Sequence, residues 1–237
     1  MRPISAKQQM ARLRVGVLLS GRGSNLRALL DACADPAYPA EIVLVVSDRG
    51  EAAGLTFAAA AGISGVVIPS RARGAFAAEV GTLLRDRRVD LVCLAGFMRV
   101  LDAAFVETWR DRIVNIHPSL LPAFPGLHPQ RQALAAGVRF AGCTVHFVRP
   151  MVDAGPIIAQ AVVATHPDDD ETSLSARILE VEHRLYPLTV RLIAEGRVRV
   201  VAGKVEIDGW RAPKIGALNP RGPSREPPRK PLVQHPN

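Results

Sequence analysis

The chain has few cysteines, few aromatic residues and no long apolar run. Its 237 residues include only Cys33, Cys93 and Cys143, with no Cys-x-x-Cys pair. This spacing argues against a disulfide framework and a metal cluster, and it suits a reducing cytoplasm. The apolar run Val15–Leu19 is too short for a signal peptide, and no segment reaches the about 18 apolar residues of a membrane span. We therefore expect a soluble, cytoplasmic protein with no metal and no membrane partner.

Aromatic residues make up only 5% of the chain, too few for a surface that stacks bare bases in rows. The net charge of +8 lies at the two ends: residues 211–237 carry +5, residues 1–14 carry +4, and the body carries −1. A basic tail can touch RNA weakly, but we favour a solubilising extension and expect no nucleic-acid partner. We predict a flexible basic extension at 1–13 and a disordered, proline-rich basic tail at 211–237.

Between these ends, short apolar runs alternate with helical patterns. This order predicts a Rossmann-like α/β fold: an open, mostly parallel twisted sheet with helices on both faces. The runs are rich in β-branched residues, as buried parallel strands should be. We expect one domain whose half 14–110 binds a phosphate and whose half 111–210 holds the catalytic groups. The expected strands are Val15–Leu19, Ile42–Ser47, Gly65–Ile68, Leu91–Ala95, Ile113–His117, Thr144–Val148 and Ile157–Val163.

The longest predicted helix begins near Thr172, where apolar residues recur at steps of three or four. Pro187 should kink this helix, because proline removes a backbone donor. The runs Val198–Val201 and Val205–Ile207 then predict a closing hairpin. The expected core-facing stripe of the long helix comprises Leu174, Ile178, Val181, Leu185, Leu188 and Leu192.

A glycine-rich turn, Ser-Gly-Arg-Gly-Ser-Asn at 20–25, follows the first strand and opens the first helix. Glycines let the backbone turn sharply, and the free N–H groups of a helix N-terminus attract an anion. We interpret Gly23, Ser24 and Asn25 as a phosphate-binding loop, against the alternative of a simple tight turn. A dinucleotide fingerprint would need a third glycine where Leu26 stands, which disfavours a nicotinamide-dependent oxidoreductase.

Asn115 and His117 lie two residues apart near the end of a predicted strand, so they share one face at the sheet edge where α/β proteins bind ligands. An amide donor beside an imidazole suits acyl transfer, because both can stabilise a developing oxyanion. A lone Asn-x-His could equally be a satisfied strand-end histidine. Asp153, taken alone, is best interpreted as a turn former. If it lay near His117, its carboxylate would favour the imidazolium and raise the pKa of that histidine.

Five segments together resemble the folate-dependent formyltransferase family, and within it the enzymes that formylate glycinamide ribonucleotide. The resemblance spans about Arg14 to Gly209. It implies transfer of the formyl group of 10-formyltetrahydrofolate to the amine of 5-phosphoribosylglycinamide in purine biosynthesis. The segments are SGRGSNL (20–26), LAGFMRVL (94–101), NIHPSLLPAFPGLH (115–128), TVHFV (144–148) and VDAGPII (152–158).

The resemblance also assigns roles to individual residues. Asn115, His117 and Asp153 match the catalytic trio, which would stabilise a tetrahedral intermediate in a direct transfer. Gly23, Ser24, Asn25 and Glu182 match the binding site of the ribonucleotide substrate. The residues that match the formylfolate site are Arg73, Met98, Arg99, Val100, Leu101, Asn115, Arg149, Pro150, Met151, Val152 and Asp153. The small-molecule partners implied are glycinamide ribonucleotide and formylfolate, bound by a monomer or a homodimer.

Two related formylfolate enzymes are the main alternatives. Methionyl-tRNA formyltransferase shares the Asn-Ile-His-Pro-Ser-Leu-Leu-Pro type of segment but carries a further C-terminal domain, which a proline-rich tail cannot form. Formyltetrahydrofolate deformylase carries an N-terminal regulatory domain, whereas 13 residues precede the resemblance here. Glycinamide ribonucleotide therefore remains the expected acceptor.

Overall fold

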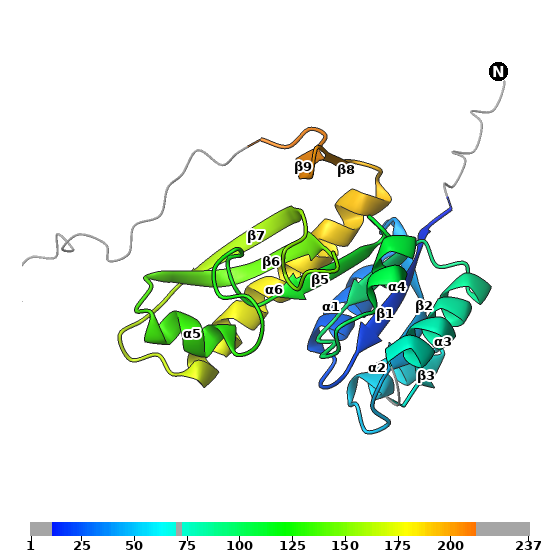
Figure 1. Ribbon diagram of the computed structural model, residues 1–237, viewed down its shortest axis with the longest axis horizontal. Helices are drawn as coiled ribbons and strands as arrows, with labels where there is room; N and C mark the ends of the chain where they lie inside the picture. Colours follow the sequence, from blue (N-terminus) through cyan, green and yellow to red (C-terminus); the bar gives the residue numbers. More distant parts are fainter. Residues whose placement is uncertain (1–10, 70–72, 212–237) are drawn as a thin grey trace, which may run out of the picture.

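A computed structural model describes residues 11–69 and 73–211 of the chain. A seven-stranded sheet in the order β3-β2-β1-β4-β5-β6-β7 forms its centre (Figure 1). This architecture confirms the predicted α/β fold with a mostly parallel sheet. The flexible extension and the disordered tail predicted at the two ends fall almost entirely outside the described residues. The seven strands are β1 (Leu13–Leu19), β2 (Ala40–Ser47), β3 (Gly65–Val67), β4 (Leu91–Leu94), β5 (Ile113–His117), β6 (Phe140–Phe147) and β7 (Ile157–Ala164).

The sheet is parallel from β3 to β5, but β6 runs antiparallel to both β5 and β7. The prediction of buried parallel strands at 144–148 and 157–163 is therefore corrected to a β6–β7 hairpin. Its connection, 148–156, is too short for the crossover that parallel neighbours require. The strand predicted at 65–68 is present as β3, but its predicted burial is wrong, because β3 lies at the sheet edge and is partly exposed.

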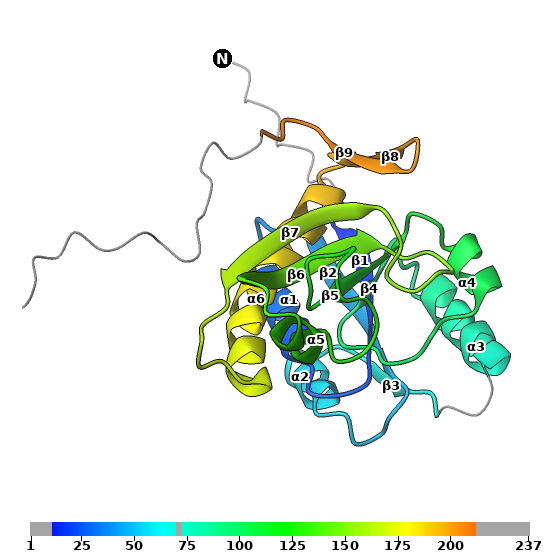
Figure 2. The same ribbon diagram turned by 60° about the vertical axis from the view of Figure 1, so that its left-hand side comes forward.

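Helices cover both faces of the sheet, with α3 and α4 on one face and α1 and α6 on the other (Figure 2). Alternate side chains of β1 enter two separate cores. Val17 and Leu19 pack on the α1–α6 side, whereas Leu18 packs on the α3–α4 side. This alternation is expected when a strand is buried on both faces. The six helices are α1 (Ser24–Cys33), α2 (Gly54–Ala60), α3 (Arg73–Asp86), α4 (Ala103–Thr108), α5 (Pro129–Ala135) and α6 (Glu171–Ala194).

Helix α6 continues through Pro187, and the predicted kink there stays a prediction. Its predicted apolar stripe is partly wrong, because Leu188 is 51% exposed. The prediction followed a strict seven-residue repeat, which drifts around a helix that has 3.6 residues per turn. The residues that α6 buries are Leu174, Ile178, Glu182, Leu185, Tyr186, Thr189 and Val190. The predicted closing hairpin is confirmed as β8 (Val198–Val201) and β9 (Lys204–Ile207), which form a separate two-stranded sheet.

Candidate active site

The glycine-rich turn places a helix N-terminus at the carboxyl end of β1. Gly23 is the N-cap of α1, has a left-handed backbone (φ 73°) and provides no side-chain cap. A Cβ atom on Gly23 would lie 2.4 Å from the Cα of Gly54, so only glycine permits this close approach. The orphan N–H groups of the first turn of α1 are therefore left to a ligand or to water.

Glu182 lies beside this helix N-terminus. Asn25 Nδ2 donates to Glu182 Oε2 at 2.7 Å, and Glu182 is only 6% exposed. Burial raises the pKa of Glu182 to about 6, although the hydrogen bond from Asn25 and the charge of Arg22 oppose the shift. Glu182 lies within the buried face of α6.

The amide oxygen of Asn25, Oδ1, is buried and has no hydrogen-bond partner within the described structure. A buried acceptor without a partner costs free energy. Glu182, the neighbour of Asn25, adds further acceptor capacity at the same place. Together these two side chains suit a ligand that brings hydroxyl or amine donors.

His117, at the end of β5, is 6% exposed and has an oxygen atom near each ring nitrogen. Nε2 lies 3.0 Å from the carbonyl oxygen of Phe124, which can only accept, so Nε2 donates. Nδ1 lies 3.4 Å from Oδ2 of Asp153. Both ring nitrogens of His117 therefore face hydrogen-bond acceptors.

Asp153 lies in the β6–β7 connection with a left-handed backbone (φ 53°), and its side chain is 8% exposed. The N–H of Gly126 donates to Oδ2 of Asp153 at 2.8 Å. Burial acts to raise the pKa of Asp153, but the His146 ring, the Gly126 N–H and the charge of His117 together hold it below its ordinary value. Asp153 is therefore a carboxylate at neutral pH, and the structure brings it to His117.

His146 is a site residue that the sequence reasoning missed. It lies on β6 opposite Asn115 and is 2% exposed. Its Nε2 lies 3.3 Å from Asn115 Nδ2 and 3.6 Å from Asp153 Oδ1. The carbonyl of Phe147 lies 3.0 Å from Nδ1, so Nδ1 donates to it. Nε2 therefore faces both the amide of Asn115 and the carboxylate of Asp153. Thr144 and His146 are polar residues two positions apart in an otherwise apolar run. This spacing could have predicted that both side chains lie on one face of the strand.

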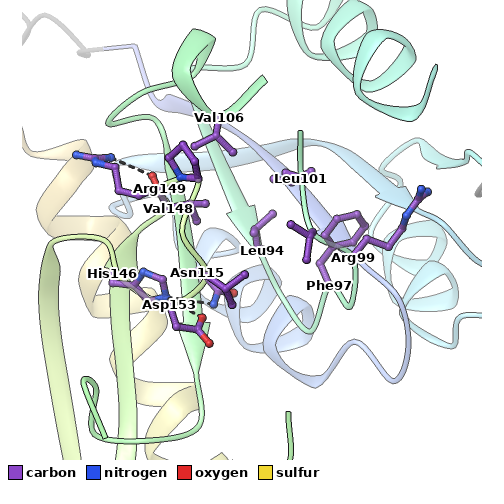
Figure 3. A pocket seen from close by; sticks show the side chains of 13 residues that line it. Leu94, Phe97, Arg99, Leu101, Val106, Asn115, His146, Val148, Arg149 and Asp153 are labelled. Carbon is purple, nitrogen blue, oxygen red and sulfur yellow. Dashed lines mark hydrogen bonds and ion pairs between the residues drawn. The ribbon is translucent and has the colours of Figure 1, made fainter. Parts of the chain in front are cut away.

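A cavity of about 110 Å³ opens beside these groups (Figure 3). Its wall is mostly apolar, with Asn115, His146 and Asp153 on the polar side. Among the residues expected at the formylfolate site, those that line it are Arg99, Val100, Leu101, Asn115, Arg149, Pro150, Val152 and Asp153.

Two residues expected at the formylfolate site lie outside the cavity wall. Met98 and Met151 are 63% and 73% exposed and do not belong to the cavity wall. Arg73 is the first residue of α3, at the boundary of the described residues. The guanidinium of Arg149 pairs with Asp111. In Figure 3 this guanidinium points away from the other side chains that line the cavity.

Arg99 lies over the Phe76 ring, with its guanidinium carbon 4.5 Å from the ring centroid. Phe76 in turn stacks on Phe97 at a centroid distance of 5.6 Å. Nη1 of Arg99 is buried and has no hydrogen-bond partner within the described structure. Arg99, which lines the cavity, therefore has a guanidinium nitrogen that could donate a hydrogen bond to an anionic group.

The phosphate loop and the His117 cluster lie at the same edge of the sheet, because β1, β4 and β5 are parallel neighbours. Strands spaced by 4.7–4.9 Å put the ends of β1 and β5 about 10 Å apart. The loops that follow β1 and β4 are joined directly: Ser20 Oγ accepts from the Met98 N–H at 2.9 Å, and the Ser20 N–H donates to Gly96 at 3.1 Å.

An uncapped helix N-terminus, an imidazole–carboxylate pair and an apolar cavity lie at one edge of a doubly wound sheet. This arrangement is typical of α/β enzymes that bind ligands at that edge. The sequence comparisons narrow this class. The formyl transferase family model matches residues 13–190, and the chain belongs to this family. Residues 11–69 and 73–211 contain no group of three or more metal-ligating side chains and no helix able to span a membrane.

The chain is 41% identical over 207 residues to phosphoribosylglycinamide formyltransferase of Escherichia coli (strain K12), covering 86% of this chain and 98% of that protein. It is 53% identical over 190 residues to the trifunctional purine biosynthetic protein adenosine-3 of Drosophila melanogaster. That match covers 78% of this chain but only 14% of the longer protein.

Solved structures show the same relationship. Glycinamide ribonucleotide transformylase 1 from Symbiobacterium toebii matches with a TM-score of 0.83 and 47% identity, over 86% of this chain and 98% of that one. A formyltetrahydrofolate deformylase from Pseudomonas syringae pv. tomato matches with a TM-score of 0.80 but only 28% identity, over 84% of this chain and 67% of that one.

Proposed function

We propose that the protein transfers the formyl group of 10-formyltetrahydrofolate to the amine of 5-phosphoribosylglycinamide in purine biosynthesis. The products are formylglycinamide ribonucleotide and tetrahydrofolate. The observation that carries the proposal is the Asn115–His117–Asp153 cluster, which lies beside an apolar cavity and at the same sheet edge as the phosphate loop. Relatives named for this reaction match nearly their whole length to this chain.

The phosphorylated substrate would bind at the α1 N-terminus. The uncapped N–H groups at Gly23, Ser24 and Asn25 suit a phosphate, because the helix end presents donors and a partial positive charge. Glu182 and the unpartnered Oδ1 of Asn25 would accept hydrogen bonds from ribose hydroxyls. The ribose would thus supply the donors that these buried acceptors lack.

The formyl donor would occupy the cavity formed by 99–101 and the 148–153 segment. Apolar walls with a few polar groups on one side suit a flat heterocycle whose edge makes hydrogen bonds. Arg99, with its buried unpartnered Nη1, would receive a carboxylate of the donor's glutamate end. Met98, Met151 and Arg73 would contact parts of the donor that extend beyond the cavity.

The reaction would proceed by direct attack of the amine on the formyl carbon. A C–N bond forms while the formyl oxygen becomes an oxyanion, which Asn115 and protonated His117 stabilise. The amine loses a proton and the departing folate nitrogen gains one. The bond between that nitrogen and the formyl carbon then breaks as the oxyanion returns to a carbonyl. Asp153 keeps His117 charged, and holding both substrates in line supplies much of the acceleration.

His117 must exchange one of its contacts to do this, because both nitrogens already face oxygens. The contact with the carbonyl of Phe124 is the one that substrate would displace, since Asp153 is needed to stabilise the charge. His146 would serve as a positioning residue that orients the amide of Asn115. We further propose that the enzyme acts in the cytoplasm, as a monomer or a homodimer.

Release of tetrahydrofolate, followed by absorbance, tests the function. We expect release only when 5-phosphoribosylglycinamide is present. Release without that substrate would instead identify hydrolysis by a deformylase, and release with formyl transfer to a charged tRNA would identify the tRNA enzyme. No release under any of these conditions, with NAD(P)H binding by fluorescence, would overturn the proposal in favour of an oxidoreductase.

The His117→Ala variant tests the mechanism. It should lose about 10²–10⁴-fold in kcat, the usual scale for general acid–base help. Circular dichroism and denaturation should show that the variant is folded. A folded variant with a near-normal kcat would remove His117 from the mechanism.

A further inference from the structure

The β6–β7 connection, residues 148–156, carries Asp153 and forms part of the cavity wall. Its outermost residues bury little surface, because Met151 is 73% and Val152 is 52% exposed. A loop with little buried apolar surface opens locally at low cost unless polar contacts fix its ends. The position of Asp153 relative to His117 therefore depends on the hydrogen bond that Asp153 accepts from the Gly126 N–H and on how the two ends of the connection are attached.

The carboxyl end of the connection is fixed by its backbone. The N–H of Phe147 donates to the carbonyl of Pro156 at 2.9 Å, which closes the loop at its base. A Cβ atom on Gly155 would lie 1.7 Å from the oxygen of Phe147, so glycine allows the two strands to close. This end needs no side-chain contact.

At the amino end, the Val148 N–H donates to the carbonyl of Ile113 at 2.9 Å, and a side chain fixes the residue that follows. The guanidinium of Arg149 forms a hydrogen-bonded ion pair with Asp111, and it donates to the carbonyl of Val148 at 3.0 Å. Asp111 lies in the turn between α4 and β5, outside the connection, and has a left-handed backbone (φ 57°). Figure 3 shows this guanidinium directed away from the cavity. The Arg149 side chain is 13% exposed, against 43% for Asp111.

We propose that Asp111 and Arg149 are positioning residues that hold the 149–153 segment in the conformation that receives the formyl donor. Arg149 lies four residues before Asp153, and its pair with Asp111 links the segment to the turn between α4 and β5. The inference rests on the proposed function, because it assigns the pair to the formyl-donor side of the site. Arg149 would thus act through Asp111 and not by contacting the donor with its charge.

This role predicts a specific kinetic pattern. If the 149–153 segment adopts the binding conformation only part of the time, the apparent affinity for the formyl donor falls in proportion to that fraction. A saturating concentration of the donor restores the binding conformation. Arg149→Met keeps the apolar stem and removes the charge. It should raise KM for the formyl donor about two- to fivefold, the scale of a partly exposed ion pair, and leave both kcat and KM for the amine substrate unchanged.

Asp111→Asn should raise KM for the formyl donor by the same factor. The double variant should have a KM no higher than that of either single variant. The matched control is the exposed Arg110–Glu107 pair, whose nitrogen and oxygen lie 2.7 Å apart and whose Arg110 directly precedes Asp111 in the chain. Glu107→Gln should leave KM for the donor unchanged. A rise in Arg149→Met without one in Asp111→Asn would show direct contact with the donor and overturn the proposal. Additive single effects would overturn it as well.

Amide hydrogen exchange in the free protein gives a readout that does not depend on activity. Exchange at 151–155 should be faster in Arg149→Met and Asp111→Asn than in the wild type and in Glu107→Gln. Unchanged exchange in both variants would refute the positioning role even if the kinetics shifted. If the wild type releases no tetrahydrofolate, the proposed function fails while this measurement still decides the role of the pair.

Discussion

Glu182 illustrates at the scale of one residue how a binding group reduces the stability of the fold. Its only hydrogen-bond donor in the described structure is the side-chain amide of Asn25. Burial raises its pKa from the ordinary 4.5 to about 6. Ionising this buried carboxyl therefore costs the folded state free energy that a bound ribose would recover by donating hydrogen bonds.

Glu182→Gln should stabilise the free protein at alkaline pH. The folded pKa is raised, so the wild type loses stability as pH rises from 4.5 through about 6, and the loss reaches about 2 kcal/mol. Urea denaturation should show no gain from the variant below pH 4.5 and the full gain above pH 7, together with weaker binding of the phosphorylated substrate. Glu180→Gln, an exposed control on the same helix, should show neither effect. A gain that does not depend on pH would contradict this account.

Asp153→Asn should change the pH dependence of the reaction. The pKa of Asp153 is lowered, so the carboxylate is charged throughout the neutral range and stabilises positive charge on His117. An uncharged amide removes that stabilisation, so the alkaline decline in kcat should move to lower pH. The rate–pH profile at saturating substrates checks this, with Asp168→Asn as an exposed control. An unchanged profile would rule out the electrostatic pairing.

At the scale of elements, the short helix α4 depends on its cap. Asp102 Oδ1 accepts from the N–H groups of Ala104 and Phe105 at 2.9 and 3.3 Å. The helix has six residues, too few to be stable without such contacts, and it brings Val106 to the cavity wall. Loss of the cap should therefore lower the free energy of unfolding and also disturb the formyl-donor site.

Asp102→Ala should lower the free energy of unfolding by about 1 kcal/mol, the usual value of an N-cap side chain. Asp102→Asn should retain most of it, because asparagine also caps. Urea denaturation of both variants at pH 7 makes the comparison. Equal losses in the two variants would show that the charge, and not the cap, matters at this position.

At the scale of the whole molecule, every residue proposed to bind or react lies between Gly23 and Glu182. The basic segment 212–237 contributes none of them. A chain that ends at Arg211 should therefore keep its rate of formyl transfer and its unfolding midpoint. Steady-state kinetics and thermal unfolding of both chains test this, and RNA binding at low and high salt tests the tail separately. Loss of transfer in the shorter chain would place part of the site in the tail.

The sequence by itself determined the seven strands of the sheet, the long helix α6, the glycine-rich turn and the shared face of Asn115 and His117. These features follow from local periodicity and from the conformational freedom of glycine. Local patterns cannot set the pairing direction of a strand or the face that a helix buries, because both depend on distant partners. Hence only the tertiary structure decided that β6 runs antiparallel and brings His146 to Asn115. It also decided that Glu182 is buried beside Asn25, and that Arg149 binds Asp111 across 38 positions of the chain.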